Sequence, residues 1–125
     1  MIWLAVAIGA ALGAPLRFGV DRFCVARWGT TYPYGTFMVN MAGSLILGLI
    51  TGLVLGIPNG NSENWDLVAA FVGTGLCGAL TTFSGFSSQV LELSRDPVHW
   101  RGAAYGLLSV IIGFALATIG YLLTY

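Results

Sequence analysis

The residues with the most evident chemistry lie inside the uncharged stretch 67–91. Glycines at positions 73, 75 and 78 are followed there by Thr81, Thr82, Ser84, Ser87, Ser88 and Gln89. Glycine is a poor helix former, and serine and threonine compete for backbone hydrogen bonds, so we expect a helical break between Gly78 and Thr82. A break would expose carbonyl and amide groups that bind ions. The alternative is a glycine-rich packing kink whose hydroxyls bond back to their own helix, and composition favours neither.

Four polar residues outside that stretch could join such a site. Asn40 lies in another apolar stretch, where its amide is costly unless it is paired, and an interhelical hydrogen bond would also satisfy it. Tyr105 and Ser109 are four residues apart and therefore share one helix face. Arg17 ends the first apolar stretch, where it could line a vestibule of the site or be an anchor that reaches the membrane interface. No catalytic dyad accompanies these residues, so nothing indicates an enzyme.

The sequence contains few other residues of the types that bind metal ions. Cys24 and Cys77 are the only cysteines, and no cluster of His or Asp lies near them, so neither a metal site nor a disulfide is expected. Cys77 sits in an apolar stretch, where a free thiol behaves as a small hydrophobe. His99 is expected to be an interfacial residue in a polar connector.

The composition requires lipid around the chain. Of its 125 residues, 57% are hydrophobic and only 8% are charged. A soluble domain carries roughly 25% charged residues to cover its surface. The formal net charge is zero and there is no lysine, so no basic surface is available for nucleic acid.

The elements that position the polar residues are membrane spans, each of which needs about 20 apolar residues. The chain offers four, at about 1–24, 34–57, 65–93 and 100–124. We therefore predict an all-α integral membrane protein, with residues 1–125 forming one four-span domain and the third span broken mid-membrane. The N-terminus, which has no basic region, is expected to be the first span rather than a signal peptide. Glycines at four-residue spacing predict tight helix packing.

Three motifs follow one another on the first three spans. The first is Gly9-x3-Gly13-Ala14-x2-Arg17-Phe18. The second is Gly35-Thr36-Phe37-x-Val39-Asn40-x2-Gly43-Ser44-x3-Gly48. The third is Gly75-x-Cys77-Gly78-x2-Thr81-Thr82-Phe83-Ser84-x-Phe86. In this order, and over nearly the whole length, the chain resembles the Fluc (CrcB) family of bacterial fluoride channels.

The resemblance implies a fluoride-selective channel that exports fluoride across the bacterial cytoplasmic membrane, built as an antiparallel dimer with two pores. It implies a structural sodium ion at the dimer centre, held by the main-chain carbonyls of Gly78 and Thr81. It also implies a fluoride path lined by Asn40, Thr82, Phe83, Ser84, Phe86, Tyr105 and Ser109. Amide and hydroxyl donors would replace the water around fluoride, and the positive edges of the phenyl rings can face an anion.

The chain departs from the family pattern at three positions. Gly85 replaces a usual threonine, Gln89 a usual glutamate, and Gly113 a usual serine, so each position loses a polar group that would line or guard a pore. One alternative is therefore a weakly conducting or non-conducting partner subunit of a heterodimeric channel. A remote alternative is a small multidrug exporter, which would need a membrane-embedded glutamate in the first span that this chain lacks.

The charges of the connectors predict a fixed orientation. The first and third connectors and their borders hold every basic residue, namely Arg17, Arg22, Arg27, Arg95 and Arg101. Positive connectors stay cytoplasmic, which places both termini outside. A chain that inserts in both directions should have a more balanced count. An antiparallel partner would then need the opposite bias, so we suspect a homologous second subunit, with an identical chain as the alternative.

Overall fold

The computed structural model describes residues 1–57, 62–95 and 97–125, and within these ranges all regular structure is helical. The elements in chain order are α1 (Ile2–Trp28), α2 (Tyr34–Gly56), α3 (Ser62–Val68), η1 (Ala69–Cys77), α4 (Gly78–Leu80), α5 (Phe83–Arg95) and α6 (Trp100–Thr124). Most of the turn expected in the second connector, residues 58–61, lies outside the described residues, as does Asp96.

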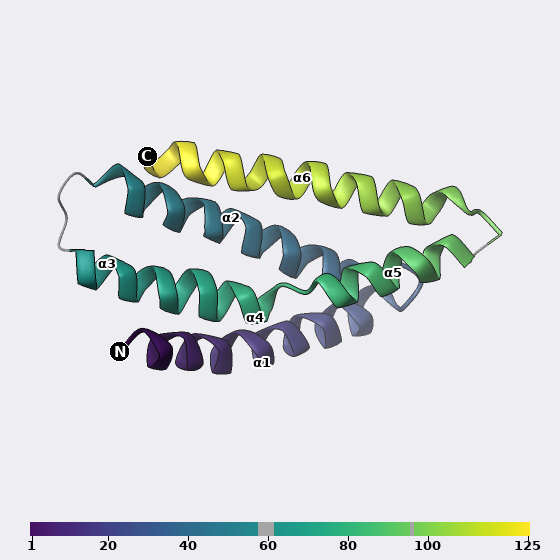
Figure 1. Ribbon diagram of the computed structural model, residues 1–125. Coiled ribbons are helices and arrows are strands. Elements are labelled where there is room, and N and C mark those ends of the chain that lie inside the picture. Colours follow the sequence, from purple (N-terminus) through teal and green to yellow (C-terminus); the bar gives the residue numbers. More distant parts are fainter. Residues whose placement is uncertain (58–61, 96) are drawn as a thin grey trace.

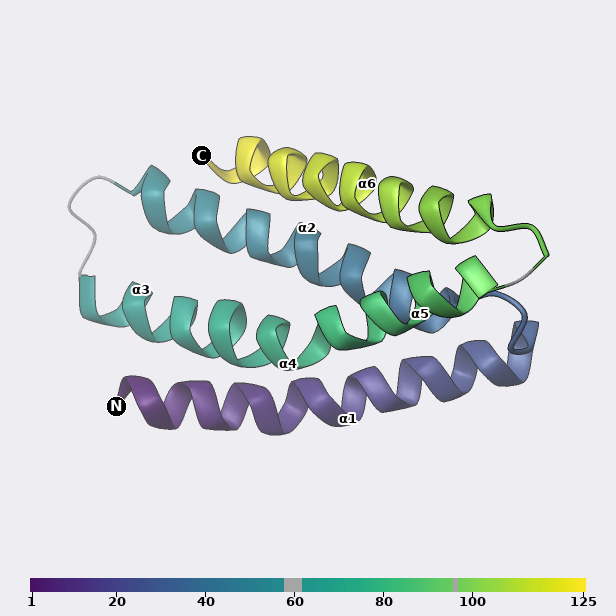
Figure 2. The same ribbon diagram turned by 45° about the vertical axis from the view of Figure 1, so that its right-hand side comes forward.

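Four helical segments are long and apolar enough to cross a membrane: Ile2–Trp28, Tyr34–Gly56, Asn64–Arg95 and Trp100–Thr124. The prediction of an all-α protein with four spans is therefore confirmed. The spans run up and down, so both termini lie at one end of the bundle and the first and third connectors lie at the other (Figure 1). The view in Figure 2 shows the same arrangement, with α1 and α6 on opposite sides of the bundle.

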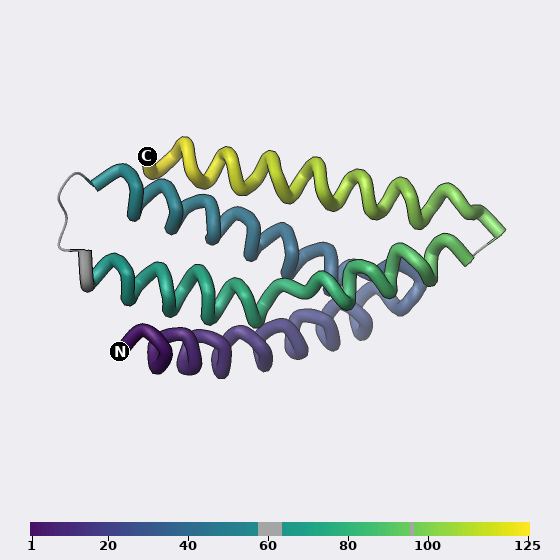
Figure 3. The backbone as a smooth tube through the Cα atoms, viewed as in Figure 1, coloured from purple at the N-terminus to yellow at the C-terminus, as the bar shows by residue number. Residues whose placement is uncertain are grey.

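The third span is built from several pieces. α3, η1 and α4 follow one another directly, whereas α4 and α5 are separated at Thr81 and Thr82 (Figure 3). Thr81 has an extended backbone, with φ −79° and ψ 156°. The expected break is confirmed, but it is narrower than the predicted 78–82, because Gly78–Leu80 is still helical. The π-helical geometry of η1 was not predicted from the sequence.

Small residues allow the helices to approach closely. A Cβ atom added at Gly48 of α2 would collide with the carbonyl oxygen of Ala117 in α6. A Cβ atom at Gly75 of η1 would lie 2.6 Å from the carbonyl oxygen of Val6 in α1. Both separations are shorter than real side chains tolerate, so the predicted glycine-mediated packing is confirmed for the α2–α6 and α1–η1 pairs.

Large apolar side chains cover the outside of the bundle. Trp3, Phe114 and Leu123 are each more than 70% exposed. Apolar exposure of this extent is rare on soluble monomers and is satisfied by lipid or by another protein. Cys24 and Cys77 are buried and free, in agreement with the expectation that no disulfide forms.

Candidate functional site

The break in the third span is held open by a side chain from the second. The last regular bond of α4 runs from the Thr81 amide to the Cys77 carbonyl, at 2.9 Å. One residue later the pattern ends, because the Thr82 amide donates to Asn40 Oδ1 at 2.9 Å. In a continuous helix that amide would donate to the carbonyl of Gly78, four residues earlier. Asn40 thus takes the donor that would otherwise pair with Gly78.

The new helix α5 is capped by the second residue of the break. The Thr82 hydroxyl accepts a hydrogen bond from the Gly85 amide at 3.0 Å, and the Thr82 carbonyl accepts one from the Phe86 amide at 3.3 Å. This is the geometry of an N-cap threonine bonded to the third residue of its helix. The Gly85 amide would pair with the Thr81 carbonyl in a continuous helix, so capping takes the usual donor from that carbonyl.

The Gly78 and Thr81 carbonyls therefore lose their helical donors. The Ala79 and Leu80 carbonyls lose theirs too, because the amides of Phe83 and Ser84 begin the new helix α5. Carbonyl oxygens freed in this way are ligands for hard cations. Among the described residues there is no group of three or more His, Cys, Asp or Glu side chains that could hold a metal ion. The family resemblance named the carbonyls of Gly78 and Thr81 as sodium ligands, and this stays a prediction.

The orientation of the Asn40 amide follows from its partner. A backbone N–H can only donate, so the atom facing the Thr82 amide must be the Asn40 oxygen. The Asn40 nitrogen then donates one hydrogen to the Thr82 carbonyl at 3.4 Å. Its second hydrogen is available to the groove that Asn40 lines. Asn40 therefore offers a hydrogen-bond donor, and not an acceptor, to an ion in that groove.

The break lies on the wall of a groove of 490 Å³ between the second, third and fourth spans. Seven residues predicted for the site line it: Asn40, Gly78, Thr81, Thr82, Phe83, Phe86 and Ser109. Phe83 is 81% exposed, although it is a large aromatic side chain. Gly113, one of the three departures from the family pattern, lines the same groove. The groove is apolar except for a few hydroxyl and amide groups, as expected for a selective site.

Aromatic rings continue from the groove toward the first connector. The ring centroids of Phe83 and Phe86 are 5.9 Å apart, and those of Phe86 and Tyr105 are also 5.9 Å apart. Tyr32 of the first connector meets Tyr105 edge to face, at 5.7 Å. Tyr32 was not among the residues predicted for the site. Nothing in the sequence around Tyr32 indicates that its ring lies at the end of this row.

Two buried hydroxyls on α6, those of Tyr105 and Ser109, form no hydrogen bond of regular geometry among the described residues, although the two side chains lie close enough to interact with each other. Their side chains are only 2% and 6% exposed. Leaving a buried hydroxyl unpaired costs about 1–3 kcal/mol, so such groups usually serve a water, an ion or a functional step. Ser109 lines the groove, whereas Tyr105 lies behind it against the ring of Phe86.

A second, more polar cavity of 320 Å³ lies between α1, α2 and α5. Arg17 and Ser84, both predicted site residues, line it together with Asp21, Gly85 and Gln89. The structure therefore does not bring Arg17 and Ser84 to the groove that holds seven of the predicted residues, and Tyr105 does not line that groove either. Thr82 lines both cavities, so the break forms a wall common to them.

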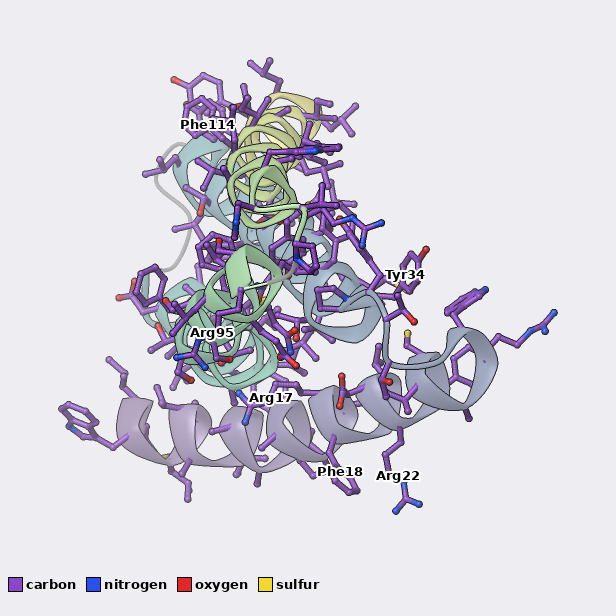
Figure 4. The ribbon with its side chains drawn as sticks, turned by 90° about the vertical axis from the view of Figure 1, so that its right-hand side faces the viewer. Arg17, Phe18, Arg22, Tyr34, Arg95 and Phe114 are labelled. Carbon is purple, nitrogen blue, oxygen red and sulfur yellow. The ribbon has the colours of Figure 1, made fainter. Side chains whose placement is uncertain are left out.

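Arg17 is half-buried and points from α1 toward the third span, whereas Phe18 and Arg22 point away from the bundle (Figure 4). The Arg22 guanidinium lies over the Phe18 ring, 5.6 Å from its centre. Asp21 follows Arg17 by four residues and lines the same cavity. Asp21 was not among the predicted site residues, although its four-residue spacing from Arg17 places the two side chains on one helix face.

Known proteins resemble this chain along nearly its whole length. Residues 4–121 match the family described as CrcB-like protein, Camphor Resistance (CrcB). A protein of Frankia casuarinae named fluoride-specific ion channel FluC 1 is 44% identical, over 96% of this chain and 93% of that protein. FluC 1 of Streptomyces avermitilis is 41% identical over 96% and 93% of the two chains, and FluC 1 of Listeria innocua is 37% identical over 97% and 95%. Because the matched region covers nearly all of the four spans, this chain belongs to the CrcB family.

Proposed function

We propose that this chain is a subunit of a fluoride-selective channel in the bacterial cytoplasmic membrane, through which fluoride leaves the cell and its toxicity is relieved. Membership of a family whose relatives are named fluoride-specific ion channels supports this function. The structural observation that carries it is the groove at the break, where the Asn40 donor meets the rings of Phe83 and Phe86. The function is conduction of an ion, not catalysis.

The chemistry of the groove suits fluoride. Fluoride is small and strongly hydrated, so a pore must replace its water with hydrogen-bond donors. The Asn40 amide supplies one donor, and the Ser109 and Tyr105 hydroxyls form no hydrogen bond of regular geometry among the described residues. The edges of Phe83 and Phe86 carry partial positive charge and add contact without strong binding. A narrow path of such groups would admit fluoride and exclude the larger chloride.

Arg17 and its cavity serve as a vestibule in this proposal. The cavity opens between the helices that lead to the arginine-rich connectors. Among the described residues, Arg17 is the one basic residue that lines it, and the acidic Asp21 lines it as well. A positive charge in a cleft with low-dielectric walls raises the local concentration of anions. Thr82 and Ser84 extend the polar lining from Arg17 to the break. Arg17 would thus attract fluoride before the ion reaches the rings.

A structural sodium ion fits the break. The Gly78 and Thr81 carbonyls lack their helical donors, and oxygen ligands are what hard cations prefer. Gly78 is exposed, and a Cβ atom added to it would meet no atom within 4 Å. Its carbonyl neighbourhood is therefore open to a second subunit that could complete the ligand set. A bound cation there would offset the cost of bringing an anion into a low-dielectric interior.

A second subunit, antiparallel to this one, would cover the groove. Phe83 and Phe114 both line the groove and remain more than 70% exposed, so a single chain does not enclose the path. The second subunit is either identical or a homologue. Some relatives carry the name FluC 1 and others FluC 2, which is compatible with paired homologous chains.

A partner subunit that conducts weakly or not at all is the second candidate function. The observation that favours it is Gly113, which lines the groove one turn beyond Ser109 and has no side chain to contribute. Gly85 and Gln89 likewise reduce the polarity of the cavity beside Arg17. In such a heterodimer the pore that uses this chain's rings would be the weaker one.

Flux from liposomes tests both candidates. The purified chain should release fluoride in preference to chloride, and it should protect cells that lack a fluoride exporter. A chain that releases fluoride only together with a homologous subunit would support the partner role. Equal release of chloride and fluoride would reject the fluoride-channel proposal.

A further inference from the structure

We propose that Asn40 is a positioning residue that keeps the third span broken, and that it thereby holds the Gly78 carbonyl ready for a cation. This inference deepens the proposed function and rests on it, because the cation is the sodium ion proposed above. It gives Asn40 a role separate from that of a donor to fluoride. The evidence is the competition between two acceptors for one backbone amide.

The competing acceptors are the Asn40 side-chain oxygen and the Gly78 carbonyl. The Thr82 amide lies 2.9 Å from Asn40 Oδ1. Residues 78–80 have helical geometry up to the break, so the Gly78 carbonyl points along the helix axis to where a helical Thr82 amide would lie. The two arrangements exclude each other, since a single N–H forms one strong hydrogen bond. When the Thr82 amide bonds to Asn40, Thr81 is therefore also fixed in its extended conformation.

The rest of the break does not by itself prevent a continuous helix. The Thr81 amide and hydroxyl both donate to the Cys77 carbonyl, at 2.9 and 2.8 Å, and these bonds are compatible with helix on either side. The cap between the Gly85 amide and the Thr82 hydroxyl stabilises the start of α5, but capping contributes only about 1 kcal/mol. Asn40 is the residue from another span that takes the Thr82 amide out of the helical pattern.

The consequence is a coupling between a side chain of α2 and the carbonyls of the third span. Without the Asn40 oxygen, the partly buried Thr82 amide would need another acceptor, because an amide left unpaired in a buried position costs about 1–3 kcal/mol. The Gly78 carbonyl is the acceptor that a helical turn would supply. Pairing with it would straighten the span and remove one of the two carbonyls proposed to bind sodium.

Three substitutions of Asn40 separate this role from that of an anion donor. Asn40→Asp keeps an oxygen to accept from the Thr82 amide but loses the donor hydrogens. Asn40→Leu and Asn40→Ala lose the acceptor as well. If Asn40 only donates to the anion, all three variants should behave alike. If Asn40 positions the backbone, Asn40→Asp should keep the wild-type backbone and sodium response and lose only fluoride flux. Thr51→Val is the matched control on α2, because the Thr51 hydroxyl donates to Leu47 within its own helix.

The first readout is the backbone at the break, measured by NMR in sodium-free and fluoride-free buffer. Threonine labelled with ¹³C at its carbonyl and threonine labelled with ¹⁵N give a signal only from Thr–Thr pairs, and the sequence contains two, 30–31 and 81–82. The carbonyl shift of Thr81 distinguishes an extended from a helical residue. The Thr30–Thr31 signal is an internal reference outside the spans.

We expect the Thr81 carbonyl shift to move toward the helical value in Asn40→Leu and Asn40→Ala. It should stay extended in Asn40→Asp and Thr51→Val, while the reference signal stays fixed in all four. An extended Thr81 in both Leu and Ala variants would overturn the proposal, even if those variants lost fluoride flux. A helical Thr81 in Asn40→Asp would overturn it as well.

The second readout is the rise in thermal midpoint when choline is replaced by sodium, since a cation bound only to the folded state stabilises it. This rise should persist in Asn40→Asp and disappear in Asn40→Leu and Asn40→Ala. Fluoride flux should fall at least tenfold in all three, because all three lack the amide donor. If the wild type failed to select fluoride while Thr81 still depended on Asn40, the proposed function would be rejected and the positioning role would stand.

Discussion

The hydroxyls of Tyr105 and Ser109 lie one turn apart on α6. Both are buried, and they lie close enough to interact with each other without reaching regular hydrogen-bond geometry. A membrane protein gains nothing in stability from such groups, because each buried unpaired hydroxyl carries a desolvation cost. Their presence is explained if they serve an ion or water that passes beside them. The first prediction follows from this cost.

Replacing these hydroxyls should separate stability from conduction. Tyr105→Phe and Ser109→Ala each remove an unpaired polar atom, so thermal stability should stay the same or rise. Fluoride flux should fall by about tenfold for each, which corresponds to roughly 1.4 kcal/mol of lost stabilisation on the path. Thr118→Val is the control, because the Thr118 hydroxyl already donates to Phe114 in its own helix. Unchanged flux in both variants would mean that the hydroxyls lie off the path.

The two phenylalanines at the break give the second prediction. Phe83→Ile and Phe86→Ile keep an apolar side chain but remove the positive ring edge, so fluoride flux should fall while the dimer stays intact. Phe23→Ile is the control for loss of an exposed ring, since Phe23 is 63% exposed and lines neither cavity. If Phe83 and Phe86 only pack the core, the variants would instead lose stability and keep their flux per folded dimer.

Two glycine-to-alanine changes should have opposite effects. In Gly48→Ala the new methyl group meets the Ala117 carbonyl, so α2 and α6 must separate and thermal stability should fall by several degrees. In Gly78→Ala the methyl group meets no atom within 4 Å in the same subunit, so the isolated fold should persist. Dimerisation and the sodium-dependent stabilisation should weaken instead. Normal dimers and a normal sodium response in Gly78→Ala would contradict the proposed interface at Gly78.

The fourth prediction concerns Tyr32 in the first connector, whose ionisation should lower the stability of the protein at alkaline pH. Partial burial, with the nearby Tyr34 as a second cause, raises the pKa of Tyr32 above its ordinary value of 10.0. Because the folded pKa is the higher one, this contribution to stability is complete below pH 10 and is lost as pH rises through the folded pKa. The difference in tyrosinate absorbance between the wild type and Tyr32→Phe should therefore titrate above pH 10. A difference that titrates below pH 10 would contradict the burial of Tyr32.

The sequence predicted the break because its cause is local. Glycines, hydroxyls and an amide at mid-membrane depth weaken a helix wherever they occur, so the interval around Thr81 and Thr82 could be identified without a structure. The same holds for the glycines that bring α1 onto η1 and α2 onto α6. The family motifs then named the groove residues, and seven of them meet in the structure.

The sequence could not predict contacts between distant residues. Asn40 and Thr82 are 42 positions apart, and the sequence indicated only that the amide needed some partner. The π-helical geometry of η1 has no simple sequence signal. Arg17 was expected either at a vestibule or at the interface. Its place in a polar cavity beside Asp21 depends on the packing of three helices.

The fifth prediction concerns orientation in the membrane. Both termini lie at one end of the bundle, and the connectors that border Arg22, Arg27, Arg95 and Arg101 lie at the other (Figure 1). The orientation of a multi-span protein follows the Lys and Arg bias of its short connectors, so the arginine-rich end should face the cytoplasm. A C-terminal tag with paired reporters should then give only the periplasmic signal. Such a fixed orientation would require a partner chain with the opposite bias to form an antiparallel dimer. Equal signals from both reporters would contradict this prediction and would favour a homodimer of one chain inserted in both directions.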